Sequence, residues 1–262
     1  MVDAFFNLPL LVTGPIIVGF LCTYAVVGML LVRRYAIPRM KFNDNDSNYG
    51  SGMVQAIMVF YGLSVALIAM NVWQTYTNVS QVISQEATAI AGLYRDVSGY
   101  PDAIRGQLQQ GLRDYLDYTI HQAWPLQAKG QIPTGGIEIM NHFQSVLIGF
   151  EPATEGQKIL HAETLHAYNA MIQARRMRLD AVGTQLPGIL WFVIILGAMI
   201  GLNAAFFFKL EDPRVHGAHV VLLAVFMGLV IFMIFALDRP FVGDLGLRPD
   251  SYQLIYDQLM KK

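Results

Sequence analysis

The sequence predicts an all-α membrane protein with four transmembrane helices in two hairpins and a helical extramembrane domain inserted between them. Of its 262 residues, 54% are hydrophobic and only 14% are charged, whereas an ordinary soluble domain carries about 25% charged residues. Four stretches lack Lys, Arg, Asp and Glu, and each supplies the roughly 20 apolar residues that cross about 30 Å of hydrocarbon. The long segment between the second and third stretches is more polar and has apolar residues at helical spacing.

The four charge-free stretches set the predicted domain boundaries. They comprise residues 4–32, 47–85, 181–208 and 215–237, and helices are the only plausible spanning form because a barrel strand needs only about 9–11 residues. We expect the spans at residues 10–32, 53–74, 186–208 and 216–237. The first hairpin then comprises residues 1–76, the extramembrane domain 77–184, the second hairpin 185–238, and a C-terminal collar and tail 239–262.

The inserted domain is predicted to be helical throughout. Apolar residues recur at a helical period through most of it, and the sequence GQIPTGG indicates a loop at residues 130–136. The pair Pro101-Asp102 suits the start of one helix, and Thr154 is suited to cap another. We expect the helix that begins at Thr154 to run on into the third span as far as Pro187.

Small residues in the third span predict close helix packing. Gly197 and Gly201 form a small-xxx-small pattern, and Ala204 and Ala205 follow. Such patterns let two helix backbones approach closely. The pattern is compatible with contacts inside one chain and with contacts between chains.

The positive charges that flank the spans give opposing indications of membrane orientation. Arginines and a lysine follow the first span, which favours a cytoplasmic loop there and an external helical domain. Other arginines precede the third span and follow the fourth, which favours the reverse. The two groups are Arg33, Arg34, Arg39 and Lys41 on one side and Arg175, Arg176, Arg178 and Arg239 on the other.

No motif in the sequence predicts an enzyme, a cofactor site or a metal site. There is no phosphate-binding glycine loop, nucleophile elbow or HExxH motif. The single cysteine, Cys22, excludes a cysteine-based metal cluster, and His161 and His166 are five residues apart, on different faces of a helix. The net charge of −1 gives no indication of nucleic-acid binding.

Uncharged polar residues inside the second span are the most informative functional signal. Gln55, Tyr61, Ser64 and Asn71 lie there, and none is ionised at neutral pH. Polar groups are costly in lipid and tend to face the bundle or a water path. A proton relay or pump more often places Asp, Glu or Lys at mid-membrane, whereas a passive pore can use weak polar groups and apolar constrictions. A purely structural bundle accommodates the same residues.

Three segments that join the spans to the inserted domain have a recognisable order and spacing. The segment MVFYGLSVALIAMNVWQTYTNVSQVISQEATAIAGLYRD leaves the second span and contains Glu86 and Arg95. The segment ARRMRLDAVGTQLPGILW enters the third span, and LDRPFVGD leaves the fourth. Together they resemble the bacterial bestrophin-like membrane protein family, and the resemblance covers nearly the whole chain.

The resemblance extends to the bestrophins themselves and implies an architecture and a function. Bestrophins are pentameric anion channels with four spans per subunit and a large helical cytosolic part between the second and third spans. The resemblance therefore implies a homo-oligomer, a pentamer by analogy, that lies in the lipid of the bacterial cytoplasmic membrane and passes an inorganic ion. Phe60-Tyr61 is similar to a Phe-Tyr pair in the bestrophin pore-lining helix. The resulting pore-lining candidates are Gln55, Phe60, Tyr61, Ser64, Leu67 and Asn71.

The segment RPFVGDLGLRPD after the fourth span is similar to the Asn-Pro-Phe-Gly segment of bestrophins, which precedes a calcium clasp. Here Arg239 replaces the Asn, and only Asp244 and Asp250 remain of the acidic run, too few for the 6–8 oxygen ligands of Ca²⁺. We expect a collar that couples the spans to the domain, and the resemblance places that domain in the cytosol. The coupling or collar candidates are Glu86, Arg95, Arg175, Arg176, Arg178, Asp238, Arg239, Pro240, Phe241 and Asp244.

Two functional hypotheses follow. The leading one is an oligomeric, passive, anion-conducting channel with the second span lining the pore. The alternative is a non-conducting membrane scaffold or sensor whose helical domain binds a partner while the spans only anchor and oligomerise. The two hypotheses differ in whether a continuous polar path runs along the symmetry axis.

Overall fold

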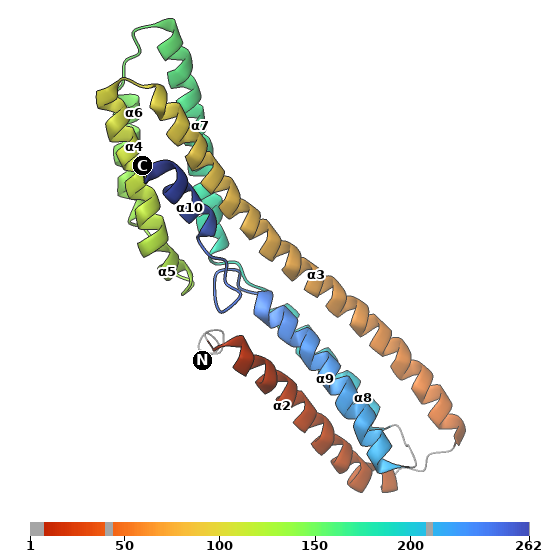
Figure 1. Cartoon of the computed structure of the whole chain (residues 1–262). Helices are drawn as coiled ribbons and strands as arrows, with labels where there is room; N and C mark the ends of the chain where they lie inside the picture. Colours follow the sequence, from red (N-terminus) through yellow and green to blue (C-terminus); the bar gives the residue numbers. More distant parts are fainter. Residues whose placement is uncertain (1–7, 40–43, 208–211, 262) are drawn as a thin grey trace. The chain divides into compact units, whose positions relative to one another are not determined.

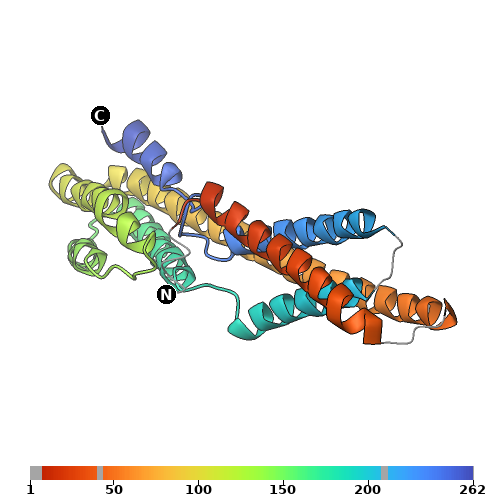
Figure 2. The same ribbon diagram turned by 90° about the horizontal axis from the view of Figure 1, so that it is seen from below.

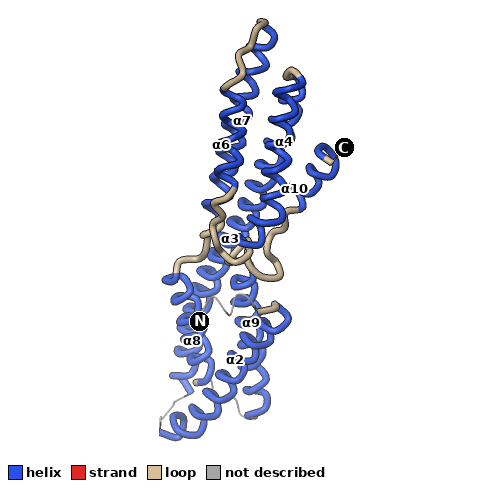
Figure 3. Tube along the Cα trace, turned by 90° about the vertical axis from the view of Figure 1, so that its left-hand side faces the viewer, coloured by secondary structure: helices blue, strands red, loops and turns tan. Residues whose placement is uncertain are grey.

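The structure is a computed structural model that describes residues 8–39, 44–207 and 212–261. Among these residues every regular element is a helix (Figures 1 and 3), which confirms the predicted all-α fold class. Lys41 and the expected end of the third span at residue 208 lie outside the described residues.

The chain divides into two compact units, which are described here one at a time. The first unit comprises Met1–Gln74 and Gln185–Arg239, and the second comprises Thr75–Thr184 and Pro240–Lys262. The helix α3, Asp44–Asp96, contributes residues to both units without a break in its helical hydrogen bonding. The sequence did not show that these 53 residues form one helix. The apolar residues of the second span give way to a more polar sequence, and we predicted a domain boundary there.

The first unit contains helices that are long and apolar enough to cross a membrane. They are α2 (Leu10–Leu31), the first part of α3, α8 (Gly188–Phe206) and α9 (Pro213–Leu237). All four qualify as candidate membrane spans by length and composition, as the sequence predicted. Beyond α2, the chain continues through a π-helical turn, η1 (Val32–Ala36), and a short 3-10 helix, η2 (Ile37–Arg39).

The core of the first unit forms chiefly between the first and last spans. The most extensive packing is between α2 and α9, while α8 contacts both of these helices (Figures 1 and 2). Ala25, Ile194, Leu202, Ala224 and Ile234 are fully buried there. The sequence predicted two hairpins of consecutive spans. In the structure, α2 instead packs mainly against α9, the last span.

The glycines of α8 are packing sites within the chain. A Cβ added to Gly197 would lie 2.3 Å from the ring of Tyr61, and one added to Gly201 would lie 2.5 Å from Met58 Sδ. Both partners belong to α3. Real Cβ atoms do not approach other heavy atoms so closely, so Gly197 lets α3 lie against α8, whereas at Gly201 the flexible end of Met58 could move aside. The small-xxx-small pattern serves contacts inside one chain.

The second unit is a helical domain with its own core. Besides the end of α3 it contains η3 (Val97–Gly99), α4 (Asp102–Tyr118), η4 (Thr119–Ala123), α5 (Trp124–Gln127), α6 (Gly136–Ile148), α7 (Glu155–Ala181), α10 (Asp250–Ile255) and η5 (Tyr256–Met260). Pro101 precedes α4, and Thr154 begins α7 through a capping box with Gln157, so both predicted helix starts are confirmed. Ile90, Leu112, Leu116, Leu147 and Met171 are fully buried in the core.

The expectation that the helix from Thr154 continues to Pro187 is wrong. α7 ends at Ala181, and the next helix, α8, begins at Gly188. Pro187 has no N–H and disfavours a helical conformation at Leu186. The Leu186 N–H instead donates to a carboxylate oxygen of Asp238, at 2.5 Å, which satisfies a donor that a continuous helix would have used internally.

Candidate functional site

The predicted pore-lining residues of α3 fall on different sides of that helix. Phe60 and Leu67 are 72% and 71% exposed, and Ser64 and Asn71 are exposed beside them. The spacing of these four residues, i, i+4, i+7 and i+11, places them on one face of the helix. We refer to Phe60, Ser64, Leu67 and Asn71 as the α3 stripe. Gln55 is also exposed, but its register places it outside the stripe.

Tyr61 lies about a quarter turn around α3 from the stripe, on the side that packs against the helix bundle. Its hydroxyl donates to the backbone oxygen of Ile194 in α8, at 2.9 Å, and its ring occupies the space that Gly197 leaves free. Val65 and Val72, on the same side of α3, are buried in the core of the first unit. In the single chain, Tyr61 therefore acts as an anchor that orients α3, and it is separated from the α3 stripe.

The α3 stripe combines bulky apolar side chains with uncharged polar groups. The Ser64 hydroxyl donates to the backbone oxygen of Phe60, at 2.9 Å, so its donor is used within the helix while its oxygen can still accept. Asn71 makes no side-chain hydrogen bond to any residue that the structure describes. An uncharged amide exposed at membrane depth is costly in lipid, so the stripe is chemically better suited to a water path or to another protein surface than to hydrocarbon.

A second group of candidates forms a buried network in the extramembrane unit. The Glu86 carboxylate, on α3, is 0% exposed. Arg178 of α7 donates to it from Nε at 2.6 Å and from Nη2 at 3.1 Å. Tyr115 of α4 and Tyr252 of α10 donate their hydroxyls to the same carboxylate, at 2.6 and 3.0 Å. The carboxylate thus joins four helices through charge-assisted hydrogen bonds, and we call these four residues the Glu86 cluster.

The electrostatics of the Glu86 cluster keep Arg178 charged and the tyrosines neutral. Burial alone would lower the pKa of Arg178, but the adjacent Glu86 carboxylate, with Tyr252 and Tyr115, raises that pKa well above its usual value. Burial, and then the negative charge of Glu86, raise the pKa of the Tyr115 hydroxyl. The Arg178 guanidinium also lies 5.9 Å from the Trp124 ring centroid. The arrangement is a buried ion pair whose two charges neutralise each other.

The structure does not bring the predicted arginines together as one basic patch. Arg178 is inside the Glu86 cluster, and Arg175 is buried with its guanidinium 5.9 Å from the Tyr115 ring centroid. Arg176 and Arg95 are exposed. No pattern in the sequence marked Tyr115 or Tyr252 as functional residues. The apolar period of the helix that contains Tyr115 indicated only that this side chain would be buried.

The C-terminal segment folds back within the extramembrane unit. Pro240 and Phe241 are buried, and the Phe241 ring lies 5.8 Å from that of Trp124. The Leu247 N–H donates to the Pro240 oxygen at 2.8 Å, which closes a tight loop. Gly243, with φ +82°, adopts a conformation inside this loop that favours glycine. Asp244 is exposed on the loop.

Two further hydrogen bonds hold this loop to the helices of the extramembrane unit. The Tyr76 hydroxyl of α3 donates to the Leu245 oxygen, and Trp124 Nε1 of α5 donates to the Leu247 oxygen, both at 2.9 Å. The segment after the fourth span is therefore a packed collar rather than a free tail. Its contacts, together with Tyr252 in the Glu86 cluster, fix the chain end to α3.

Asp238 ends the fourth span of the first unit. α9 finishes at Leu237, and the Asp238 carboxylate accepts from the Leu186 N–H at 2.5 Å and from Trp191 Nε1 at 3.4 Å. Burial raises the pKa of Asp238 above its usual value, although these two hydrogen bonds and the nearby Arg239 oppose the shift. Asp238 therefore connects the end of α9 to the start of α8.

The raised pKa of Asp238 predicts a small pH-dependent contribution to stability. Protonation favours the folded state, so this contribution is fully present below the unfolded-state pKa of about 4 and is lost as the pH rises through the raised folded-state pKa. Wild type loses this contribution at neutral pH, whereas Asp238→Asn has no carboxyl group to titrate. We therefore expect the Tm of Asp238→Asn minus that of wild type to be on the order of 2 °C higher at neutral pH than at acidic pH. Thermal unfolding of detergent-solubilised protein at both pH values measures this difference. Asp180→Asn, at an exposed position of α7, is the control, and an equal Tm difference at both pH values would contradict the assignment.

The described residues contain no group of three or more His, Cys, Asp or Glu side chains that could hold a metal ion. The His161 ring lies within hydrogen-bond distance of the Tyr100 hydroxyl, at 2.9 Å. This histidine is therefore part of the packing between α7 and the residues after α3.

Comparison with known proteins identifies the family. A family model described as the bestrophin-like domain matches residues 19–252. The match begins in α2 and ends at Tyr252, and it includes the α3 stripe and all four residues of the Glu86 cluster. Neither the curated proteins nor the solved structures give a match. The chain therefore belongs to the bestrophin-like family, a family of channel-type membrane proteins.

Proposed function

We propose that the protein is an oligomeric, passive, anion-conducting channel of the bacterial cytoplasmic membrane, with α3 lining the pore. The observation that carries the proposal is the α3 stripe, where the exposed Ser64 and Asn71 alternate with Phe60 and Leu67 on a span that packs against the bundle through a different side. Polar groups in a span tend to face a water-filled cavity or a protein partner, and α3 offers them away from its own bundle.

The proposal requires more than one copy of the chain. In the single chain, the core of the first unit lies on the Tyr61 side of α3, so the α3 stripe has no facing helix from that core. Several copies arranged around an axis would place several stripes opposite one another, with Phe60 and Leu67 as apolar constrictions and Asn71 as a weak polar site. The family supports this arrangement, and by analogy the number of copies is five.

The charge distribution supports passive conduction without rings of fixed charge. The sequence from residue 47 to residue 85 contains no Asp, Glu, Lys or Arg. Pumps and proton relays place ionisable groups at mid-membrane, and cation channels commonly use rings of Asp or Glu. A path lined by α3 would contain neither. It would discriminate through hydration and weak amide and hydroxyl contacts.

Thiol modification in proteoliposomes tests the proposal. In a Cys22→Ala background, single cysteines replace Leu67 and Asn71, and a control cysteine replaces Leu222, which is 69% exposed on α9. We expect chloride flux from the reconstituted oligomer, and we expect a charged thiol reagent to block it at positions 67 and 71 but not at 222. The proposal is wrong if pure oligomer carries no ions in several salts and pH values. Block at 222 alone would place the pore elsewhere.

A further inference from the structure

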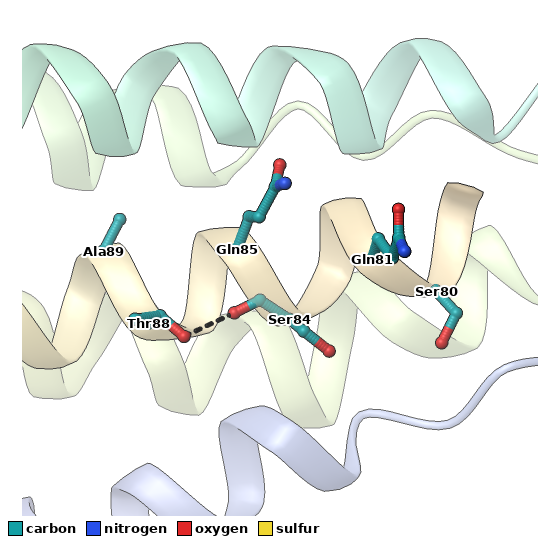
Figure 4. Close-up of a pocket in the computed structure, with 6 residues that line it drawn as sticks. All are labelled: Ser80, Gln81, Ser84, Gln85, Thr88 and Ala89. Atoms are coloured by element: carbon teal, nitrogen blue, oxygen red, sulfur yellow. Dashed lines mark hydrogen bonds between the residues drawn. The ribbon is translucent and has the colours of Figure 1, made fainter. Parts of the chain in front are cut away.

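We propose that an uncharged hollow on the extramembrane part of α3 is a weak binding site for small monovalent inorganic anions, formed by side-chain hydroxyls and amides. The hollow has a volume of about 680 Å³ and is lined by Ser80, Gln81, Ser84, Gln85, Thr88 and Ala89 (Figure 4). This inference rests on the proposed function, because it adds a selectivity site outside the membrane to the same conduction path.

The side chains of the hollow form two rows along one helix. Ser80, Ser84 and Thr88 are spaced by four residues and form a hydroxyl row, while Gln81 and Gln85 form an amide row. The Thr88 hydroxyl donates to the Ser84 backbone oxygen at 2.8 Å, which Figure 4 shows as a dashed line. The donor of Thr88 is therefore used within the helix.

The other four polar side chains of the hollow retain their donors. Ser80, Gln81, Ser84 and Gln85 make no side-chain hydrogen bonds to the residues that the structure describes. Each serine offers one O–H and each glutamine offers two N–H groups. An anion that enters the hollow can exchange part of its water shell for these donors, and the volume leaves room for the rest, at about 30 Å³ per water.

The hollow lacks the charges found on the other exposed helix faces of the domain. Asp102 and Arg105 on α4, and Glu155 and Lys158 on α7, form exposed ion pairs. On α3, Glu86 follows Gln85 directly, but its carboxylate is fully buried and neutralised by Arg178. A site without fixed charge holds an ion weakly, which is what conduction requires, because an ion must leave as readily as it enters.

Helix register relates the hollow to the α3 stripe. Gln85 lies two heptads after Asn71, and Gln81 lies two heptads after Leu67, so these residues recur on one face of an uninterrupted helix. A stripe that lines a pore in the membrane would thus continue as a polar, uncharged face outside it. The amide row of the hollow lies on that face, and the hydroxyl row lies beside it.

Charge substitutions of opposite sign test the site in the full-length, reconstituted oligomer. We expect Gln85→Glu and Gln81→Glu to lower the anion-to-cation permeability ratio, from reversal potentials in low-salt chloride gradients, by about threefold or more. We expect Gln85→Lys to raise it. Gln173→Glu and Gln173→Lys, at an exposed position of α7, change the net charge equally and should leave the ratio unchanged. A merely structural role would not reverse with the sign of the charge.

A binding measurement separates this site from the proposed function. Chloride exchange broadening of the ³⁵Cl NMR signal by detergent-solubilised oligomer should fall in a Gln81→Ala, Gln85→Ala variant and persist in Gln173→Ala. If the wild-type protein carries chloride while the Gln85 variants match the Gln173 controls in both permeability ratio and ³⁵Cl broadening, the anion site is overturned but the proposed channel function is not. Glutamine-dependent broadening without flux would overturn the channel and support the site. If both Gln85→Glu and Gln85→Lys dissociate the oligomer, this face of α3 is a contact surface between copies of the chain. That result would overturn the anion site.

Discussion

Arg178→Ala is expected to destabilise the extramembrane unit by about 3–5 kcal/mol, because removal of one partner leaves a buried charge uncompensated. The Glu86 carboxylate would keep only the hydroxyls of Tyr115 and Tyr252 as donors, in a site where it is 0% exposed. Thermal unfolding followed by tryptophan fluorescence measures the loss, since Trp124 lies beside Arg178. The expected decrease in Tm is on the order of 10 °C.

The neighbouring arginine gives a matched control for this prediction. Arg176 lies two residues before Arg178 on α7, but its side chain is exposed. Arg176→Ala should therefore change the Tm little. A double variant, Glu86→Leu with Arg178→Met, removes both charges and should recover most of the stability. Equal losses for Arg178→Ala and Arg176→Ala would show that the Glu86 cluster is not what joins these helices.

Gly197→Ala is the second substitution with a large expected effect, and it acts on the first unit. The added Cβ would lie 2.3 Å from the Tyr61 ring, and that ring is held by the hydrogen bond from its hydroxyl to the Ile194 oxygen. The clash must move α3 or α8, at a cost of about 1–3 kcal/mol. The midpoint of unfolding in mixed detergent micelles measures this cost, and we also expect a reduced yield of oligomer, because Tyr61 orients the α3 stripe.

Two variants distinguish overpacking from a general effect of adding a methyl group. Gly62→Ala places a Cβ where no atom lies within 4 Å, and it should be neutral or slightly stabilising since alanine favours helix more than glycine. Tyr61→Ala combined with Gly197→Ala should be more stable than the sum of the single effects predicts, because the two residues are in contact. Strict additivity would mean that Gly197 does not accommodate the Tyr61 ring.

The sequence predicted the fold class because membrane spans depend on composition more than on tertiary contacts. A stretch of about 20 apolar residues must cross the bilayer as a helix wherever its neighbours lie, and all four candidate spans are helices. Local signals also predicted the starts of α4 and α7, where Pro101 and the Thr154–Gln157 capping box act on adjacent backbone. The expected continuation of α7 to Pro187 was wrong because the competing acceptor, Asp238, is 52 residues away from Leu186 in the chain.

The candidate site was only partly accessible from sequence. Periodicity identified the second span and its polar residues, but it did not separate Tyr61 from the α3 stripe, because both faces of α3 carry aromatic and apolar residues. That distinction came from the Ile194 oxygen and the space at Gly197, both on a helix more than 100 residues later. The Glu86 cluster likewise combines residues from four helices, and nothing local to Tyr252 predicts its contact with Glu86.

The sequence by itself determined the all-helical class, the four membrane-capable helices and the membership in the bestrophin-like family. These follow from hydropathy, period and order of segments, which are properties of the chain read along its length. Only the tertiary structure decided that α2 lies mainly against α9, that Arg178 is buried against Glu86 while Arg176 is exposed, and that the segment from Pro240 packs as a collar. Those outcomes depend on hydrogen bonds and side-chain volumes contributed by distant parts of the chain, and a linear pattern does not contain them.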